Sequence, residues 1–169
     1  NNHSINWVVQ KKQLGTGHAV QQAKTNINDK STCIILYGDV PFISTNTIKS
    51  LIAQSQSTGF SLLSVILDDP SGYGRIVRDK NKVIQSIIEH KDADDEKQKI
   101  NEINTGIMAI TGSLLKKYIS QLEPNNKQGE LYLTDIVEIA VSDNVTISSL
   151  VCDNVSEVMG INNKNQLAE

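Results

Sequence analysis

Two uninterrupted apolar runs of strand length constrain the fold of this chain more than any other feature. Thr32–Tyr37 and Phe60–Leu67 are rich in β-branched and large apolar residues, and neither alternates strictly with polar ones. Such runs are typical of strands that are covered on both faces, as in a parallel sheet. Between them, Ser44 can cap a helix that places Ile48 and Leu51 on one face. The strand, helix, strand order predicts an α/β fold.

The rest of the chain continues this alternation. Arg75–Arg78 and Val83–Ile88 flank a polar turn and predict an antiparallel hairpin. The other expected strands are Ile5–Val9, Ile103–Thr111 and Val145–Val151. The other expected helices are His18–Thr25, Ser113–Leu122, Asp135–Val141, which Thr134 can cap at its N-terminus, and Asn162–Glu169. No linker or repeat divides residues 1–169. We therefore predict one three-layer α/β domain with a mixed, mainly parallel sheet and an inserted hairpin, which binds ligands at the carboxyl ends of its strands.

The charge balance argues against nucleic acid and membrane partners. The chain has 16 Lys and Arg against 19 Asp and Glu, and only two of the basic residues are arginines. Binding to DNA or to an anionic membrane surface usually needs a basic excess. No apolar run approaches the roughly 20 residues that span a bilayer. Cys33 and Cys152 belong to no Cys/His cluster, so we expect reduced thiols and a cytoplasmic protein.

The most informative local motif is Gly38-Asp39-Val40-Pro41, which directly follows an apolar strand. A carboxylate at this end of an α/β sheet is a natural partner for Mg²⁺, which keeps most of its waters and takes substrate phosphates. Aspartate is also common in turns, where it accepts hydrogen bonds from backbone N–H groups. The motif by itself leaves both interpretations open.

Other motifs offer polar, uncharged groups at loops. In Gly15-Thr16-Gly17 the backbone can approach a flat ligand or a phosphate closely, although a tight strand-to-helix turn explains the glycines equally well. Asn104-Thr105-Gly106 and Gly129–Thr134 carry the hydrogen-bonding groups that grip sugar hydroxyls and amides, or they are solvated loops. His3, His18 and His90 lack metal-ligand spacing, and no Ser/His/Asp or Cys/His set indicates covalent catalysis.

Taken together, the motifs closely resemble one enzyme family, in order and along essentially the whole chain. They are Gln10 with Gln13–Ala19, Tyr37–Pro41, Asp68–Ile76, Ile88–Ala93, Glu102–Ile107 and Leu133–Ile136. The chain resembles the uridylyltransferase domain of bacterial bifunctional N-acetylglucosamine-1-phosphate uridylyltransferase/glucosamine-1-phosphate N-acetyltransferase. The resemblance implies a Rossmann-like nucleotide-diphospho-sugar transferase fold and a Mg²⁺-dependent enzyme. It would convert UTP and N-acetylglucosamine 1-phosphate into UDP-N-acetylglucosamine, a cell-envelope precursor, and pyrophosphate.

The resemblance also implies roles for individual residues. The uracil would be held by Gln10, Gly15 and Thr16. The Mg²⁺ would be held by Asp39 and Asn162, so that Asp39 acts in catalysis through the metal. The pocket for N-acetylglucosamine would be lined by Gly74, Glu89, Asn104, Tyr132 and Thr134. A sugar phosphate is already a nucleophile, so such a reaction needs positioning and charge neutralisation and no protein nucleophile.

One departure from the family concerns the start of the chain. The family's first strand and its glycine-rich loop, with the Arg and Lys that grip the triphosphate, would precede Asn1. We therefore expect a partial domain, incomplete at its N-terminus, with little turnover alone and with marginal stability or a tendency to associate. A homotrimer is expected only for a full-length protein with the acetyltransferase portion. The alternatives are a pyrophosphorylase for another sugar 1-phosphate and a non-catalytic module that binds uridine and sugar.

Overall fold

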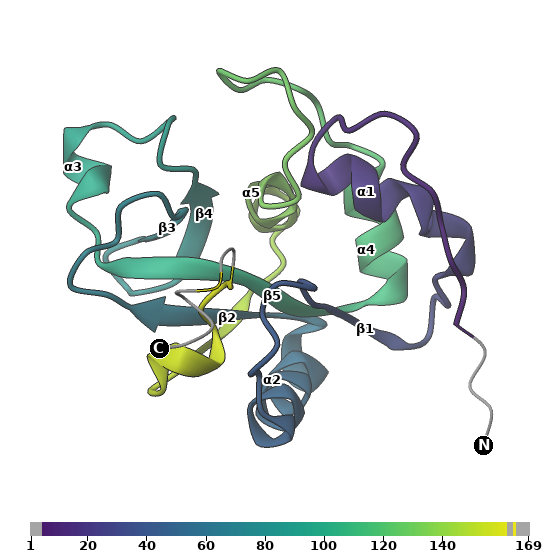
Figure 1. Cartoon of the computed structure of the whole chain (residues 1–169), viewed down its shortest axis with the longest axis horizontal. Helices are drawn as coiled ribbons and strands as arrows, with labels where there is room; N and C mark the ends of the chain where they lie inside the picture. The colour runs from purple at the N-terminus through teal and green to yellow at the C-terminus, as the bar shows by residue number, and fades with distance from the viewer. Residues whose placement is uncertain (1–4, 162–163, 165–169) are drawn as a thin grey trace.

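The computed structural model describes residues 5–161 and Lys164. Within these residues, six strands form one sheet, with helices on both faces (Figure 1). The strands are β1 (Thr32–Ile35), β2 (Phe60–Ile66), β3 (Arg75–Arg78), β4 (Ile84–Ile88), β5 (Glu102–Thr111) and β6 (Ser148–Val151). The helices are α1 (Thr16–Gln22), α2 (Thr45–Thr58), α3 (Asp95–Gln98), α4 (Gly112–Ile119) and α5 (Asp135–Ser142), with short 3-10 turns at Lys24–Asn26 and Val155–Glu157.

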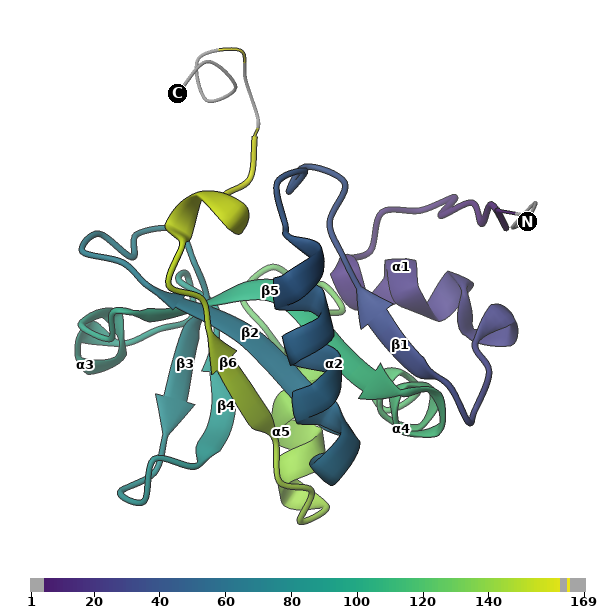
Figure 2. The ribbon, with the colours of Figure 1, turned by 90° about the horizontal axis from the view of Figure 1, so that it is seen from below.

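The helices form two layers around the sheet. Helix α2 packs on one face against β2 and β6, while α4 and α5 cover the other face and α1 lies beside α4 (Figures 1 and 2). Each face has its own hydrophobic core. Phe60 and Leu62 of β2 enter the core under α4 and α5, and Leu63 and Val65 enter the core under α2. Each of these side chains is almost fully buried, and each contributes about 1.5–3 kcal/mol. The prediction that β2 is buried on both faces is confirmed.

The long strand β5 organises the sheet. Strand β2 pairs along one side of β5, while β1 and β3 share the other side. Ile35 of β1 lies opposite Met108, and Arg75 of β3 lies opposite Ile103, so the middle of β5 faces a gap between the end of β1 and the start of β3. Three predicted motifs border this gap: Tyr37 follows the end of β1, Gly74 precedes the start of β3, and Asn104-Thr105-Gly106 lies in the middle of β5. The end of β1 is a carboxyl end and the start of β3 is not, so the expected site at the carboxyl ends of the strands agrees with this place only in part.

The predicted three-layer α/β fold with a mixed sheet and an inserted β3–β4 hairpin is confirmed, but the sheet is not mainly parallel. Among the described strands, only β2 and β6 pair in parallel, and the pairings of β5 with β1, β2 and β3 are antiparallel. Apolar runs report burial and carry no information on strand direction. The prediction that Thr32–Tyr37 forms a strand buried on both faces is also wrong, because β1 is only partly buried and, among the described strands, pairs with β5 alone.

The first predicted strand is wrong. Residues 5–9 form no strand, and Ile5, Trp7 and Val9 are exposed to solvent. A β-branched run forms a strand only where another strand offers its backbone groups, and among the described residues none pairs with this segment.

The predicted helices agree with the structure in part. Ser44 caps α2, because its Oγ accepts a hydrogen bond from the Thr47 N–H at 3.1 Å. The helix predicted from His18 begins earlier, at Thr16, and ends at Gln22. The short α3, capped by Asp94, was not predicted. The helix predicted at Asn162–Glu169 lies outside the described residues, apart from Lys164.

Candidate functional site

The site begins with a bulge in β5 at Asn104-Thr105-Gly106. The register between β2 and β5 shifts here, and the Thr105 hydroxyl donates a hydrogen bond to the Leu63 carbonyl at 2.7 Å. Gly106 has φ of +79°, a left-handed conformation that favours glycine. A Cβ on Gly106 would lie 2.4 Å from the ring of Tyr37. The bulge therefore lets the Tyr37 ring pack directly on the β5 backbone, at the gap between β1 and β3.

Asn104 is held at the edge of this gap. Its backbone N–H donates to the Gly74 carbonyl at 2.8 Å, which joins the start of β3 to β5. The side chain is only 8% exposed, and its Oδ1 has no hydrogen-bond partner among the described residues. A buried amide oxygen without a partner is costly, and a bound ligand can satisfy it.

Glu89, Gly74 and Thr134 meet on the same side of the sheet as Asn104. A Cβ on Gly74 would lie 3.3 Å from Glu89 Oε2, so the missing side chain leaves room for that carboxylate. Thr134 occupies the N-cap position of α5, but its side chain does not cap the helix, contrary to the prediction. Its hydroxyl instead donates to Glu89 Oε1 at 2.9 Å. Burial raises the pKa of Glu89, and the nearby charge of Asp92 adds to this, while the Thr134 hydrogen bond acts in the opposite direction.

The three residues predicted to hold the uracil lie together at the start of α1. Gln10 Nε2 donates to the Gly15 carbonyl at 3.1 Å, and Thr16 Oγ1 accepts from the Leu133 N–H at 3.0 Å. Gly15 has φ of +110°, and a Cβ there would lie 2.5 Å from the Leu131 carbonyl oxygen. This contact brings the glycine-rich turn against the segment that carries Tyr132.

A cavity of about 180 Å³ joins these two groups of residues. Its lining includes predicted residues from both, namely Thr16, Glu89 and Tyr132. The remaining lining residues are Gly72, His90, Lys91 and Gln128, to which the sequence assigned no role. The Tyr132 hydroxyl donates to Gln128 Oε1. The structure thus places parts of the predicted uracil and sugar sets around one space.

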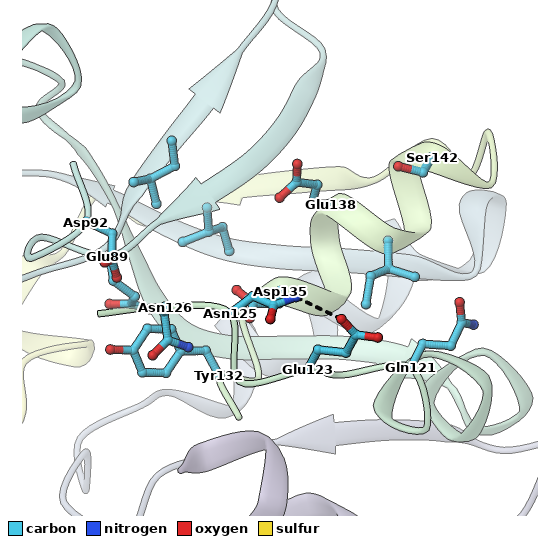
Figure 3. Close-up of a pocket in the computed structure, with 13 residues that line it drawn as sticks. Glu89, Asp92, Gln121, Glu123, Asn125, Asn126, Tyr132, Asp135, Glu138 and Ser142 are labelled. Atoms are coloured by element: carbon cyan, nitrogen blue, oxygen red, sulfur yellow. Dashed lines mark hydrogen bonds between the residues drawn. The ribbon is translucent and has the colours of Figure 1, made fainter. Parts of the chain in front are cut away.

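Glu89 and Tyr132 also line a larger cavity of about 490 Å³ (Figure 3). Carboxylates surround it, with Asp135 and Glu138 on α5 and Asp92 beside Glu89. Burial, together with the charges of Glu138, Glu89 and Asp92, raises the pKa of Asp135 to about 6. Burial, together with the charges of Asp92, Glu89, Glu130 and Asp135, raises the pKa of Tyr132 to about 12.

Asp39 lies in the loop after β1, with its side chain exposed. Its carbonyl oxygen accepts from the Ile161 N–H at 2.7 Å, so the chain just before Asn162 lies against Asp39. Asn162 itself is outside the described residues. Tyr37 belongs to this part of the site, although no role was predicted for it. Burial raises its pKa, and the charges of Glu89 and Asp39 do so further. No local sequence signal identifies Tyr37, because its contact with Gly106 exists only in the folded chain.

The Asp39 carboxylate suits Mg²⁺, which needs few protein ligands, better than a metal ion that protein side chains enclose completely. Among the described residues, no cluster of three or more His, Cys, Asp or Glu side chains could enclose a metal ion. Asp39 is exposed, and its carboxylate accepts no hydrogen bond from the residues that the structure describes. Such a group suits Mg²⁺, which commonly binds through one or two carboxylates, water and substrate phosphates.

The nucleotidyl transferase family matches residues 1–155. The chain belongs to this family. Two bacterial relatives called bifunctional protein GlmU are similar over all 169 residues: one from Ruthia magnifica subsp. Calyptogena magnifica is 55% identical, and one from Vesicomyosocius okutanii subsp. Calyptogena okutanii is 56% identical. The chain spans 37% of the length of each. The predicted resemblance and the prediction of a nucleotidyltransferase are confirmed at the level of the family.

Solved structures of nucleotidyl transferases share the fold. A putative glucose-1-phosphate thymidylyltransferase from Bacillus anthracis, in complex with sucrose, superposes with a TM-score of 0.65 at 23% identity. The match covers 85% of this chain and 55% of that one. A UDP-glucose pyrophosphorylase bound to UDP-glucose gives the same TM-score at 19% identity, with 83% and 55% covered. Within the described part of the chain, no helix is long and apolar enough to cross a bilayer.

Proposed function

We propose that this nucleotidyl transferase chain transfers UMP from UTP to N-acetylglucosamine 1-phosphate in a Mg²⁺-dependent reaction. The observation that carries the proposal is the buried, unpartnered Oδ1 of Asn104 beside Gly74 and Glu89. An amide oxygen accepts hydrogen bonds and cannot donate them. The acetamido N–H and the hydroxyls of N-acetylglucosamine are suitable donors. The family membership and the motif series support a uridylyl transfer to this sugar phosphate.

The chemistry asks the protein mainly to position its substrates. An oxygen of the sugar phosphate attacks the α-phosphorus of UTP, the bond to the bridging oxygen of the β-phosphate breaks, and pyrophosphate leaves. Gln10 and the backbone at Gly15 would orient the uracil, while Asn104 and Glu89 would orient the sugar. Holding two reactants in line makes the step effectively unimolecular, and this accelerates the reaction without a protein nucleophile.

Two residues would hold the metal, Asp39 and Asn162. Bound there, Mg²⁺ supplies neutralising charge for the phosphates. The exposed Asp39 carboxylate is free to serve, because no described residue donates a hydrogen bond to it. We expect Asp39→Asn to weaken Mg²⁺-dependent binding of UDP-N-acetylglucosamine in calorimetric titrations, and to leave binding measured without Mg²⁺ nearly unchanged. Equal loss with and without Mg²⁺ would show that Asp39 does not act through the metal.

The sugar assignment is tested by pyrophosphate release in the gene product that carries this chain. With UTP, we expect turnover with N-acetylglucosamine 1-phosphate and much less with glucose 1-phosphate. Asn104→Ala should raise KM for the N-acetylated sugar phosphate about tenfold, the effect of removing one well-placed hydrogen bond in a desolvated site. Thr105→Ser, which keeps the neighbouring hydroxyl, is the matched control and should leave KM unchanged.

Pyrophosphate release and ligand binding together distinguish the two alternative functions. Equal turnover of the two sugar phosphates, unaffected by Asn104→Ala, would indicate a pyrophosphorylase of different specificity. Tight binding of UDP-N-acetylglucosamine without any pyrophosphate release would indicate a non-catalytic module.

A further inference from the structure

Arg75 is the first residue of β3 and the largest fully buried side chain among the described residues, with only 1% of its surface exposed. The ion pairs found within residues 5–161 do not include it, whereas Arg78 in the same strand pairs with Glu102. The charge of Arg75 acts on Asp69, whose pKa is lowered mainly by hydrogen bonds from Ser71 and further by the charges of Arg75 and His90. A buried guanidinium that forms no ion pair is costly. The contacts that Arg75 does make therefore call for an explanation.

Arg75 joins two loops that contribute to the site. Its Nη1 donates to the Tyr73 carbonyl, which directly precedes Gly74. Its Nη2 lies 3.4 Å from His90 Nδ1, and His90 directly follows Glu89. Its Nε has no acceptor among the described residues.

The chemistry of this pair fixes the state of the histidine. An arginine side chain donates hydrogen bonds and never accepts them. His90 Nδ1 must therefore be the acceptor, which requires a neutral ring with its proton on Nε2. A protonated His90 would lose the acceptor and would bring a second positive charge to the buried guanidinium of Arg75.

Arg75 and His90 lie at the same end of the β3–β4 hairpin, Arg75 at the start of β3 and His90 just after β4. Arg75 lies opposite Ile88 in the strand register, so it shares a face with Ile88, while Gly74 contacts Glu89 on the other face. His90 lies in the loop that follows β4 and lines the 180 Å³ cavity together with Thr16 and Tyr132. Of the two hydrogen-bond partners of Arg75 within residues 5–161, Tyr73 and His90, only His90 lines this cavity.

We infer that Arg75 is a positioning residue that holds His90 as a neutral Nε2–H donor toward an oxygen of the bound sugar 1-phosphate. The inference rests on the proposed function, because the substrate it names is the one proposed above. His90 becomes a substrate contact in addition to those predicted from the sequence. Through the Tyr73 carbonyl, the same guanidinium also keeps Gly74 in place beside Glu89.

Nitrogen NMR of the imidazole ring tests the Arg75–His90 contact directly, independently of activity. In the wild-type protein at neutral pH, we expect His90 to be a single tautomer with the proton on Nε2. Arg75→Lys keeps the charge but loses the forked donor, and it should give a mixture of tautomers. Arg78→Lys is the matched control in the same strand and should leave His90 unchanged. A wild-type His90 with its proton on Nδ1, or a doubly protonated ring, overturns the inference even if Arg75→Lys fails to fold.

Kinetics then test the substrate contact. His90→Phe keeps an aromatic ring without donors and should raise KM for N-acetylglucosamine 1-phosphate about 3- to 10-fold, with KM for UTP and kcat little changed. His90→Gln, which restores an N–H donor, should recover most of this loss. An unchanged KM in His90→Phe, in an enzyme that releases pyrophosphate normally, overturns the inference and leaves the proposed function intact. If the wild-type protein shows no uridylyl transfer, the proposed function fails, and the substrate assignment of His90 fails with it. The tautomer measurement still decides the contact with Arg75.

Discussion

Gly106→Ala should destabilise the protein strongly, for two separable reasons. An alanine at φ of +79° pays the cost of the left-handed conformation, about 1–2 kcal/mol. Its Cβ would also lie 2.4 Å from Tyr37 Cε2 and 2.8 Å from Cζ, so the ring must move, which costs about 1–3 kcal/mol more as an overpacking effect. We expect the free energy of unfolding to fall by roughly 2–5 kcal/mol in total.

Gly129→Ala is the matched control for this prediction. Gly129 has φ of +66°, and nothing lies within 4 Å of the position of its Cβ, so it should pay the conformational cost alone. Urea unfolding of both variants measures the difference. In a Tyr37→Ala background, Gly106→Ala should cost only the conformational part, because the ring that the new Cβ would overlap is absent. Equal destabilisation by Gly106→Ala and Gly129→Ala would refute the conclusion that the Tyr37 ring is packed rigidly on β5.

Three further predictions concern charge. Because the pKa of Asp135 is raised to about 6, its protonated form stabilises the fold at low pH, and this stability is lost as the pH rises from about 4 through 6. Asp135→Asn should remove that loss and raise the midpoint of urea unfolding at pH above 7. A midpoint that falls would contradict the conclusion that burial and neighbouring carboxylates raise this pKa. Arg78→Ala leaves Glu102 without the two hydrogen bonds it now accepts from Arg78, at 2.8 and 2.6 Å, and should cost about 1.5–3 kcal/mol in urea unfolding; Glu102→Gln should cost less, since it keeps part of the network. Removing Mg²⁺ with a chelator should weaken the binding of UDP-N-acetylglucosamine in the wild-type protein and not in Asp39→Asn, and an equal effect on both would place the metal elsewhere.

The sequence predicted the elements whose signals are local. The buried run of β2, the serine cap of α2 and the β3–β4 hairpin depend on residues that are close in the chain, and all three are present. The strand predicted at residues 5–9 failed because strand formation depends on a partner, which no local pattern reveals. Strand direction was missed for the same reason, since burial of an apolar run is compatible with either direction.

The site was predicted as a set of residues, and its geometry was not. Motif order indicated that Gly74, Glu89 and Asn104 act together, and the structure brings them to one gap beside β5. Thr134 was expected to cap a helix, and only the fold shows that its hydroxyl is used by Glu89 instead. Tyr37 was missed because its position depends on a close approach to Gly106, about 70 residues away in the sequence.

The parallel pairing of β6 with β2 has a consequence for how the protein folds. This pairing joins Ser61 to Ser148, whereas the β3–β4 hairpin closes through a short turn. Closing a long loop costs more entropy than closing a hairpin, so we expect the hairpin that carries Gly74 and Glu89 to form first and β6 to dock last. In pulsed hydrogen exchange, the amides of β4 should gain protection before those of β6, and the reverse order would contradict this sequence of events. A chain that emerges from the ribosome would then place Gly74 beside Glu89 before it closes the far edge of its sheet.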